Sequence, residues 1–600
     1  MRLPAKNATA PVVALVLAMT GALDAAGQTV KERELPPLPG TKLPGSALPG
    51  SGANAGPLAM PDRGPRVIVS PHAAPHAAPP ARDAERARPD LRERRFQSDA
   101  GLRHRLWIGT PYTLLAETLP RLPVRIVSPV IRSLTLEILT TSADPVDGAP
   151  IAARLAALCA ERLYAMGQLE AADAAFRSAP PPKGDPARAP VEIETKLLLY
   201  GPRAACDALA QHLAARASPY LERASIACHA FAGEHGKAAL GLGVLGERGV
   251  AAGEVFAGLV IAQQPELARP LGALGRADAW SVRLLAETKL AWPEDAVRLG
   301  APALLRVVAE STNEPSAVRI AAAERAFMLG ALDRLKLVAV YASARFREAA
   351  LGQAGRLQLA HYSPVQRALL FQAAMRARDR RLQIEILANW WRLARADRGE
   401  ALASLVTAPI VLDLPPGAEW RENAAAISRV FFYAGELERA LDWYSWIKDA
   451  TFKDMDAYIR LGAIAQLAET SGKAWTPAEA RAWAEHQRSR ASPAGERRID
   501  LMRALEQGLG ARGSRVGALL ADAGDRAADD GLAGWRNARA AARAGRSGEA
   551  ILLMLTALGH DGVARAEPRA LGAAVGVLAT LGRETEARRL AVESALANGF

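Results

Sequence analysis

The segment FFYAGELERALDWYSWI, residues 431–447, has the spacing on which our interpretation of the fold depends. Gly435 follows an apolar stretch, the small residue Ala440 comes five positions later, and the large residue Tyr444 comes four positions after that. A glycine can close a helix in the left-handed conformation, and a small residue lets the next helix approach closely. The spacing therefore predicts two helices joined by a tight turn at Gly435.

The same spacing recurs elsewhere in the chain. It is found in YAMGQLEAADAAFRSAP (164–180) and AARAGRSGEAILLMLTA (541–557), and in weaker form in AFAGEHGKAAL (230–240) and ATLGRETEARRLAVESA (579–595). The matching positions are Gly167, Ala172, Phe176 and Ala179; Gly545, Ala550, Met554 and Ala557; Gly233 and Ala238; and Gly582, Ala587 and Ala591. One hairpin cannot bury its apolar face alone, so we expect neighbouring hairpins to stack and share a core.

These repeats resemble the tetratricopeptide repeat, whose aromatic and alanine positions are matched by Phe176 and Ala172 and by Tyr444 and Ala440. The resemblance implies an all-α fold in which stacked helical hairpins form a curved solenoid. At about 34–40 residues per helix pair, residues 101–600 would hold roughly 12–14 pairs.

Helix starts are marked by a second signal, a Ser or Thr followed by Pro. The hydroxyl can cap the first turn, and Pro is favourable at the first helical position. Such pairs occur at Thr110-Pro111, Ser128-Pro129, Ser218-Pro219, Ser363-Pro364, Thr476-Pro477 and Ser492-Pro493, and Thr476 with Glu479 forms a capping box. Apolar residues do not alternate with period two, so we expect helices with almost no sheet.

The chain divides into four segments by composition. Residues 1–27 have the pattern of a secretory signal peptide: Arg2 and Lys6, an apolar run over 11–23, and the small residues before a cleavage site after Gly27. Residues 28–100 are rich in Pro, Gly and Ala and predict a disordered linker. The solenoid is expected over 101–412 and 418–600, separated by a break at Pro415-Pro416-Gly417.

The overall composition narrows the function classes. Half of the 600 residues are hydrophobic, which excludes wholesale disorder, and the formal net charge is +12. A basic surface attracts polyanions, but nucleic acid is not expected as the partner of an exported chain. We expect a protein or an anionic component of the cell envelope as partner, a periplasmic location, and no stable membrane insertion after cleavage. No nucleotide, metal or cofactor motif is present, so no cofactor is expected.

The three cysteines, Cys159, Cys206 and Cys228, lie within 70 residues of one another. An exported chain can form disulfides, so one bridge and one free thiol form one alternative. We favour the other alternative, in which all three are small buried helix residues.

Two tryptophans are candidates for a binding surface. The helix that contains Ala440 and Tyr444 also contains Trp446, which points away from the predicted core face. Trp391 is at the edge of an apolar stripe centred on Trp390. We therefore expect Trp391 and Trp446 to contact a partner.

Glu310 is the one candidate for catalysis. Glu310-Ser311, followed by Pro315 and Ala317, resembles the start of the catalytic motif of soluble lytic transglycosylases, in which a Glu acts as general acid and base on peptidoglycan. The Gly-Leu-Met-Gln continuation of that motif is missing. We expect a non-enzymatic scaffold in a motor, secretion or cell-wall complex, with a peptidoglycan-acting enzyme as the alternative.

Overall fold

The computed structural model describes residues 106–141, 149–178, 188–213, 218–449, 455–469, 475–489, 493–510 and 533–600. In these ranges the chain forms 27 α-helices and no β-strand, so the predicted all-α fold is confirmed. The expected signal peptide, residues 1–27, and the expected linker, residues 28–100, lie outside the described residues.

The first part of the chain folds into α3 (Tyr112–Thr118), α4 (Pro129–Thr140), α5 (Ala149–Ala165), α6 (Leu169–Ser178), α7 (Ala189–Tyr200), α8 (Pro202–Leu213), α9 (Pro219–Phe231), α10 (His235–Glu247), α11 (Glu254–Ile261) and α12 (Ala279–Glu287). The middle part contains α13 (Pro302–Glu310), α14 (Ser316–Met328), α15 (Arg334–Ser343), α16 (Glu348–Gln353), α17 (Pro364–Arg376), α18 (Arg380–Ala396) and α19 (Glu400–Val411). Short 3-10 helices occur in the connections, among them η4 (Glu294–Arg298), η5 (Ala354–Arg356) and η7 (Ala418–Trp420).

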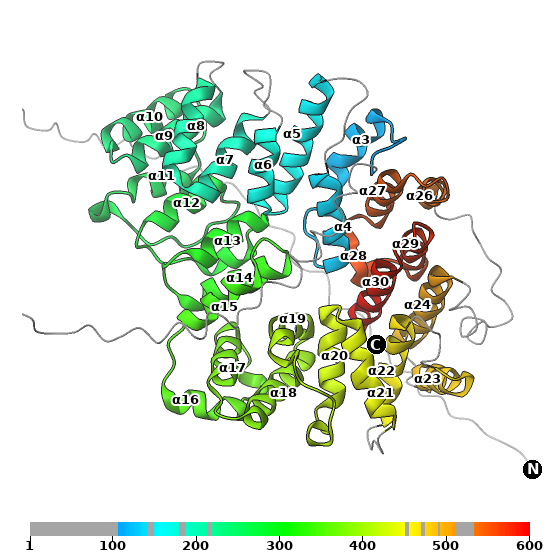
Figure 1. Ribbon diagram of the computed structural model, residues 1–600. Coiled ribbons are helices and arrows are strands. Elements are labelled where there is room, and N and C mark those ends of the chain that lie inside the picture. Colours follow the sequence, from blue (N-terminus) through cyan, green and yellow to red (C-terminus); the bar gives the residue numbers. More distant parts are fainter. Residues whose placement is uncertain are drawn as a thin grey trace, which may run out of the picture. The chain divides into compact units, whose positions relative to one another are not determined.

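The last part contains α20 (Ala424–Ala434), α21 (Leu437–Asp449), α22 (Met455–Ala468), α23 (Pro477–Ser489), α24 (Pro493–Leu509), α26 (Ala533–Arg543), α27 (Ser547–Leu558), α28 (Gly562–Arg565), α29 (Pro568–Thr580) and α30 (Glu584–Ala597). Most successive helices pack against each other along the chain, as the colour order in Figure 1 shows. The Pro415-Pro416-Gly417 stretch lies in the connection between α19 and η7, and α19 packs against α20 across it.

The hairpin turns form where the repeat spacing predicts them. All five predicted glycines have φ between +72° and +78°, the left-handed conformation that ends a helix before a turn. The small residue five positions after each glycine is buried in the contact between the two helices: Ala172, Ala238, Ala440, Ala550 and Ala587. The stacked helical hairpins are therefore confirmed.

The predicted helix starts are also confirmed where the chain is described, except at Thr110-Pro111. There α3 begins at Tyr112, and the Thr110 hydroxyl accepts no capping hydrogen bond from the described residues. The hydroxyls of Ser128, Ser218 and Ser363 each accept a hydrogen bond from a backbone N–H in the first turn of α4, α9 and α17. At α23 the capping box is complete, because Thr476 N donates to Glu479 (2.6 Å) and Glu479 N donates to Thr476 Oγ1 (3.3 Å). Ser492 lies outside the described residues.

Helices α24 and α29 cross at glycines. A Cβ added at Gly572 would lie 2.3 Å from the carbonyl oxygen of Ala504, and one added at Gly508 would lie 2.4 Å from the carbonyl oxygen of Gly572. At Gly576, one turn after Gly572, the nearest atoms would be 3.6 Å away, an ordinary contact. The two backbones therefore touch at Gly508 and Gly572 and diverge from there.

A buried ion pair joins α19 to α20. Arg429 donates through Nε to Glu400 Oε1 (2.8 Å) and through Nη1 to the backbone oxygen of Phe600 (2.6 Å). Glu400 also accepts a hydrogen bond from Tyr433 and forms an ion pair with Arg395. Burial raises the pKa of Glu400, but the two arginines outweigh it and hold the pKa below its usual value.

The first described helices contact the last ones. Arg583, just before α30, pairs with Glu137 of α4 (2.6 Å), although 446 positions separate them. Glu593 of α30 accepts hydrogen bonds from Val130 N (3.2 Å) and from Ser128 at the start of α4. Helix α4 also packs against α27 and α30, so the contact is apolar as well as charged (Figure 1).

Candidate functional site

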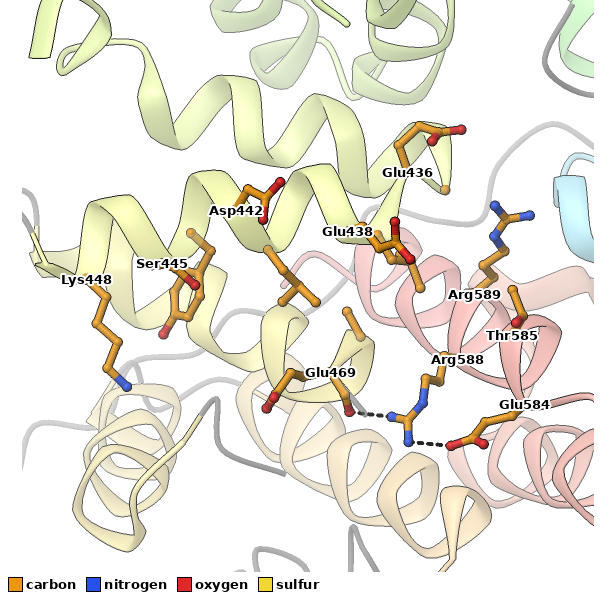
Figure 2. Close-up of a pocket in the computed structure, with 15 residues that line it drawn as sticks. Glu436, Glu438, Asp442, Ser445, Lys448, Glu469, Glu584, Thr585, Arg588 and Arg589 are labelled. Carbon is orange, nitrogen blue, oxygen red and sulfur yellow. Dashed lines mark hydrogen bonds and ion pairs between the residues drawn. The ribbon is translucent and has the colours of Figure 1, made fainter. Parts of the chain in front are cut away.

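A partly open groove lies between α21, the end of α22 and the start of α30, and has a volume of about 600 Å³. Its lining includes five carboxylates and three basic side chains (Figure 2). The charged residues are Glu436, Glu438, Asp442, Lys448, Glu469, Glu584, Arg588 and Arg589. The groove has more carboxylates than basic groups, whereas the chain as a whole has a formal net charge of +12.

One wall of the groove is the outward face of α21. Glu438, Asp442 and Ser445 follow each other at intervals of four and three residues, which places them along one side of a helix. That side is opposite Ala440 and Trp443, which are buried in the core. The amphipathic pattern of α21 thus fixes which of its residues reach the groove.

The other wall is the first turn and a half of α30. Arg588 is buried and held in place, because it donates to the backbone oxygen of Glu469 (2.6 Å) and to Glu584 (2.9 Å). Arg589 is only partly buried, but its Nε is buried and has no hydrogen-bond partner among the described residues. The Nε of Arg588 likewise has no partner among the described residues, but its two terminal nitrogens fix Arg588 in the wall, whereas no described residue pairs with Arg589.

The tryptophans expected at a binding surface have different environments. Trp391 is 3% exposed, and its Nε1 donates to Thr407 Oγ1 of α19 (2.9 Å). Its expected surface position is wrong, because α19 covers the edge of the α18 stripe and supplies the indole N–H with a buried acceptor. Trp446 is partly exposed and packs against the core from the flank of α21, and it does not line the groove.

Glu310 is the last residue of α13 and is exposed. Its carboxylate pairs with Arg306 (3.2 Å) and Lys336 (2.8 Å). A general acid on a glycan needs a cleft that shields it from water, whereas Glu310 is exposed and does not line the groove described above.

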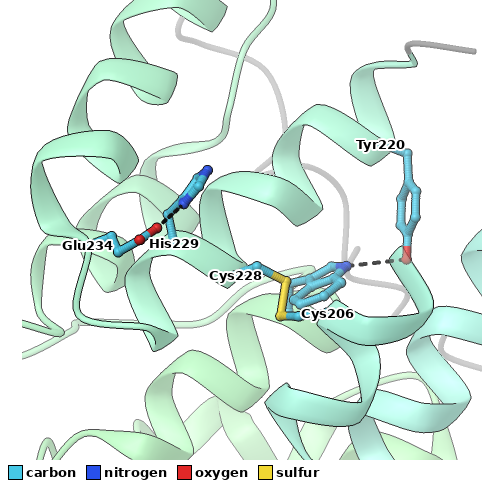
Figure 3. Close-up of a disulfide and its surroundings, with 6 residues drawn as sticks. Cys206, Tyr220, Cys228, His229 and Glu234 are labelled. Atoms are coloured by element: carbon cyan, nitrogen blue, oxygen red, sulfur yellow. Dashed lines mark hydrogen bonds and ion pairs between the residues drawn. A yellow bond between two sulfur atoms is a disulfide. The ribbon is translucent and has the colours of Figure 1, made fainter. Parts of the chain in front are cut away.

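A disulfide joins Cys206 of α8 to Cys228 of α9, with the Cα atoms 5.8 Å apart (Figure 3). Our preference for three reduced cysteines is wrong for these two residues, because adjacent helices of one hairpin stack bring their side chains together. Cys159 is free, and burial raises the pKa of its thiol to about 12. The raised pKa disfavours the thiolate, which is the reactive form of a cysteine.

The described ranges contain neither a cluster of metal ligands nor a helix that could cross a membrane. No three His, Cys, Asp or Glu side chains gather there in an arrangement that would hold a metal ion. None of the helices in these ranges combines the length and apolar character that crossing a membrane requires.

Glu506 of α24 is a buried carboxyl group outside the groove. Its Oε1 accepts a hydrogen bond from Gln466 Nε2 (3.3 Å), while Oε2 and the amide oxygen of Gln466 have no partner in the part of the chain that the structure describes. Burial raises the pKa of Glu506 to about 8, only partly offset by the bond from Gln466. The folded state therefore favours the protonated acid.

We expect the parent protein to lose stability at alkaline pH because Glu506 becomes charged while buried, and we expect the Glu506→Gln variant not to show this loss. A carboxyl with a raised pKa stabilises the folded state fully below its unfolded pKa, and this contribution is lost as pH rises through about 8. At pH 9.5 the variant should be about 2 kcal/mol more stable than the parent, since glutamine carries no charge to bury. Urea unfolding from pH 6 to 9.5 measures the difference, with the exposed Glu485→Gln as control. Parallel pH profiles of parent and Glu506→Gln would refute the expectation.

The groove residues were not singled out from the sequence. The stripe formed by Glu438, Asp442 and Ser445 is visible in the sequence as the polar face of an amphipathic helix, but such a face is normally solvated. This face lines a groove only because Arg588 and Arg589, about 150 positions later in the chain, lie opposite it. No local pattern predicts that arrangement.

No family model matches the chain, and neither a curated protein nor a solved structure is similar enough to count as a match.

Proposed function

We propose that this chain is an exported, periplasmic interaction protein without enzymatic activity, whose tetratricopeptide-like hairpins hold a protein of the cell envelope. The observation that carries the proposal is the charged groove between α21 and α30. Stacked hairpins provide a rigid support for such a groove, and its α21 wall carries the carboxylates of Glu436, Glu438 and Asp442, which pair with no described residue. The partner belongs to a motor, secretion or cell-wall complex.

The disulfide supports the proposed location. Disulfides form and persist in oxidising compartments, which include the bacterial periplasm, and are rare in the cytosol. Cys206 and Cys228 would therefore remain bonded after export. The leader-like residues 1–27 supply the matching export signal.

The location is tested by thiol labelling of the full chain made in a Gram-negative host. After denaturation without reduction, a maleimide should label one cysteine per chain in the periplasmic fraction, and three after reduction. A Cys159→Ala variant should show no label before reduction and two afterwards. Three labelled cysteines without reduction, or recovery of the uncleaved chain in the cytoplasm, would contradict export.

Partner binding is tested by cross-linking in intact cells. A photo-reactive amino acid at Asp442 should give a discrete adduct with an envelope protein, because this position lines the groove. The same amino acid at Glu385, exposed on α18, is the matched control. An adduct pattern that is the same at both positions, or no adduct at Asp442, would refute the groove as the binding surface.

A further inference from the structure

The carboxylates on the α21 side of the groove are not paired with other side chains in the described ranges. Glu436, Glu438 and Asp442 form no ion pair or side-chain hydrogen bond with any other residue in the described ranges, and Glu438 and Asp442 are exposed. Four residues along a helix correspond to about 6 Å, so Glu438 and Asp442 lie one helical turn apart. Two or three negative charges are thus presented together along one wall (Figure 2).

The α30 side presents the opposite charge. Arg588 binds Glu469 through Nη1 and Glu584 through Nη2, whereas Arg589 forms no ion pair with any residue in the described ranges. The side chain of Arg589 as a whole is only partly buried, so its positive charge faces the groove without an internal counter-charge among the described residues. The groove therefore carries a negative wall on α21 and one unpaired positive charge on α30.

We propose that the groove binds an extended segment of the partner protein that places Lys or Arg side chains against Glu438 and Asp442 and a carboxylate against Arg589. The inference rests on the proposed function and specifies the chemistry of the partner. The carboxylates on α21 repel phosphate groups, which disfavours an anionic envelope polymer at this site. A volume of about 600 Å³, open on one side, suits a short stretch of chain better than a single ion.

The test measures binding of fluorescent hexapeptides to the full chain by fluorescence anisotropy at 50 mM salt. Three peptides with blocked ends and a Gly-Ser background are compared: one with two Arg and one Glu, one with two Arg only, and one with two Glu only. The expected order of affinity follows the order given, with the mixed peptide at least tenfold tighter than the two-Glu peptide. Equal affinity for the three peptides, or a preference for the two-Glu peptide, would overturn the proposal.

Groove variants identify each wall separately. Glu438→Gln with Asp442→Asn should weaken both Arg-containing peptides about tenfold, whereas Arg589→Gln should reduce the mixed peptide to the affinity of the two-Arg peptide. Glu247→Gln with Glu266→Gln changes the net charge equally at exposed positions of α10 and η3 (Pro265–Leu267) and should leave all affinities unchanged. If this control weakens binding as much as the groove variant, overall charge and not the groove determines affinity, and the proposal fails.

Failure of the proposal is distinguishable from failure of the proposed function. If no peptide binds but the photo-reactive group at Asp442 captures an envelope protein, the partner does not use a basic segment. If neither experiment gives a signal, the groove is not the binding surface. A thermal unfolding curve for each variant excludes loss of the fold as the cause of lost binding.

Discussion

Arg429→Met is expected to lower the free energy of unfolding by about 3–5 kcal/mol, because it leaves Glu400 buried without its main counter-charge. Arg429 is 8% exposed and bridges α19, α20 and the backbone of Phe600, so methionine replaces none of its hydrogen bonds. Arg395 remains beside Glu400 but is half-exposed. Equilibrium urea unfolding followed by circular dichroism measures the loss.

Two further variants separate the burial of the carboxylate from the loss of packing. Arg395→Met should cost less than about 1 kcal/mol, as expected for an ion pair with one exposed partner. Adding Glu400→Gln to Arg429→Met should restore part of the stability, because the buried charge is then removed. If Arg429→Met were no worse than Arg395→Met, the buried pair would not be a determinant of stability.

Gly572→Ala is the second large effect that we expect, with a loss of about 2–3 kcal/mol. The added methyl group would lie 2.3 Å from the backbone oxygen of Ala504, so α24 and α29 would have to move apart. A backbone atom cannot rotate away as a flexible side chain can. The melting temperature and hydrogen exchange of amides in α24 and α29 measure the effect.

Gly576→Ala is the matched control, because it makes the same chemical change one turn along the same helix. Its added methyl group would meet its nearest neighbours at 3.6 Å. Alanine is favoured over glycine in a helix by about 0.5–1 kcal/mol, so this variant should be neutral or slightly stabilised. Equal destabilisation by both substitutions would show that α29 tolerates no side chain there, and that the close approach at Gly572 is not the reason.

Local features of this fold could be predicted because each depends on residues close together in the sequence. Gly435, Ala440 and Tyr444 specify a turn and a close helix contact within ten residues, and the structure has both. The capping box of Thr476 and Glu479 spans four residues and is likewise present. Helix starts, turns and the stacking of hairpins follow from such short-range chemistry.

Features that depend on distant parts of the chain could not be predicted. Trp391 is buried because α19 covers it, and periodicity within α18 alone places it at the edge of the core. The groove requires Asp442 and Arg589 to lie on facing walls, and the disulfide requires Cys206 and Cys228 to meet across two helices. Each of these depends on the angle between helices, which the apolar pattern of a single helix does not determine.

The contact of α4 with α27 and α30 restricts how this chain can change in length. An ordinary open array of helical hairpins can gain or lose one unit at little cost, because each unit touches only its neighbours. Here the pairing of Glu137 with Arg583 fixes how many units fit between the two. An inserted or deleted hairpin would separate these partners and expose apolar surface on both sides. Duplication of a single repeat would therefore destabilise this protein, so we do not expect its length to have evolved in that way.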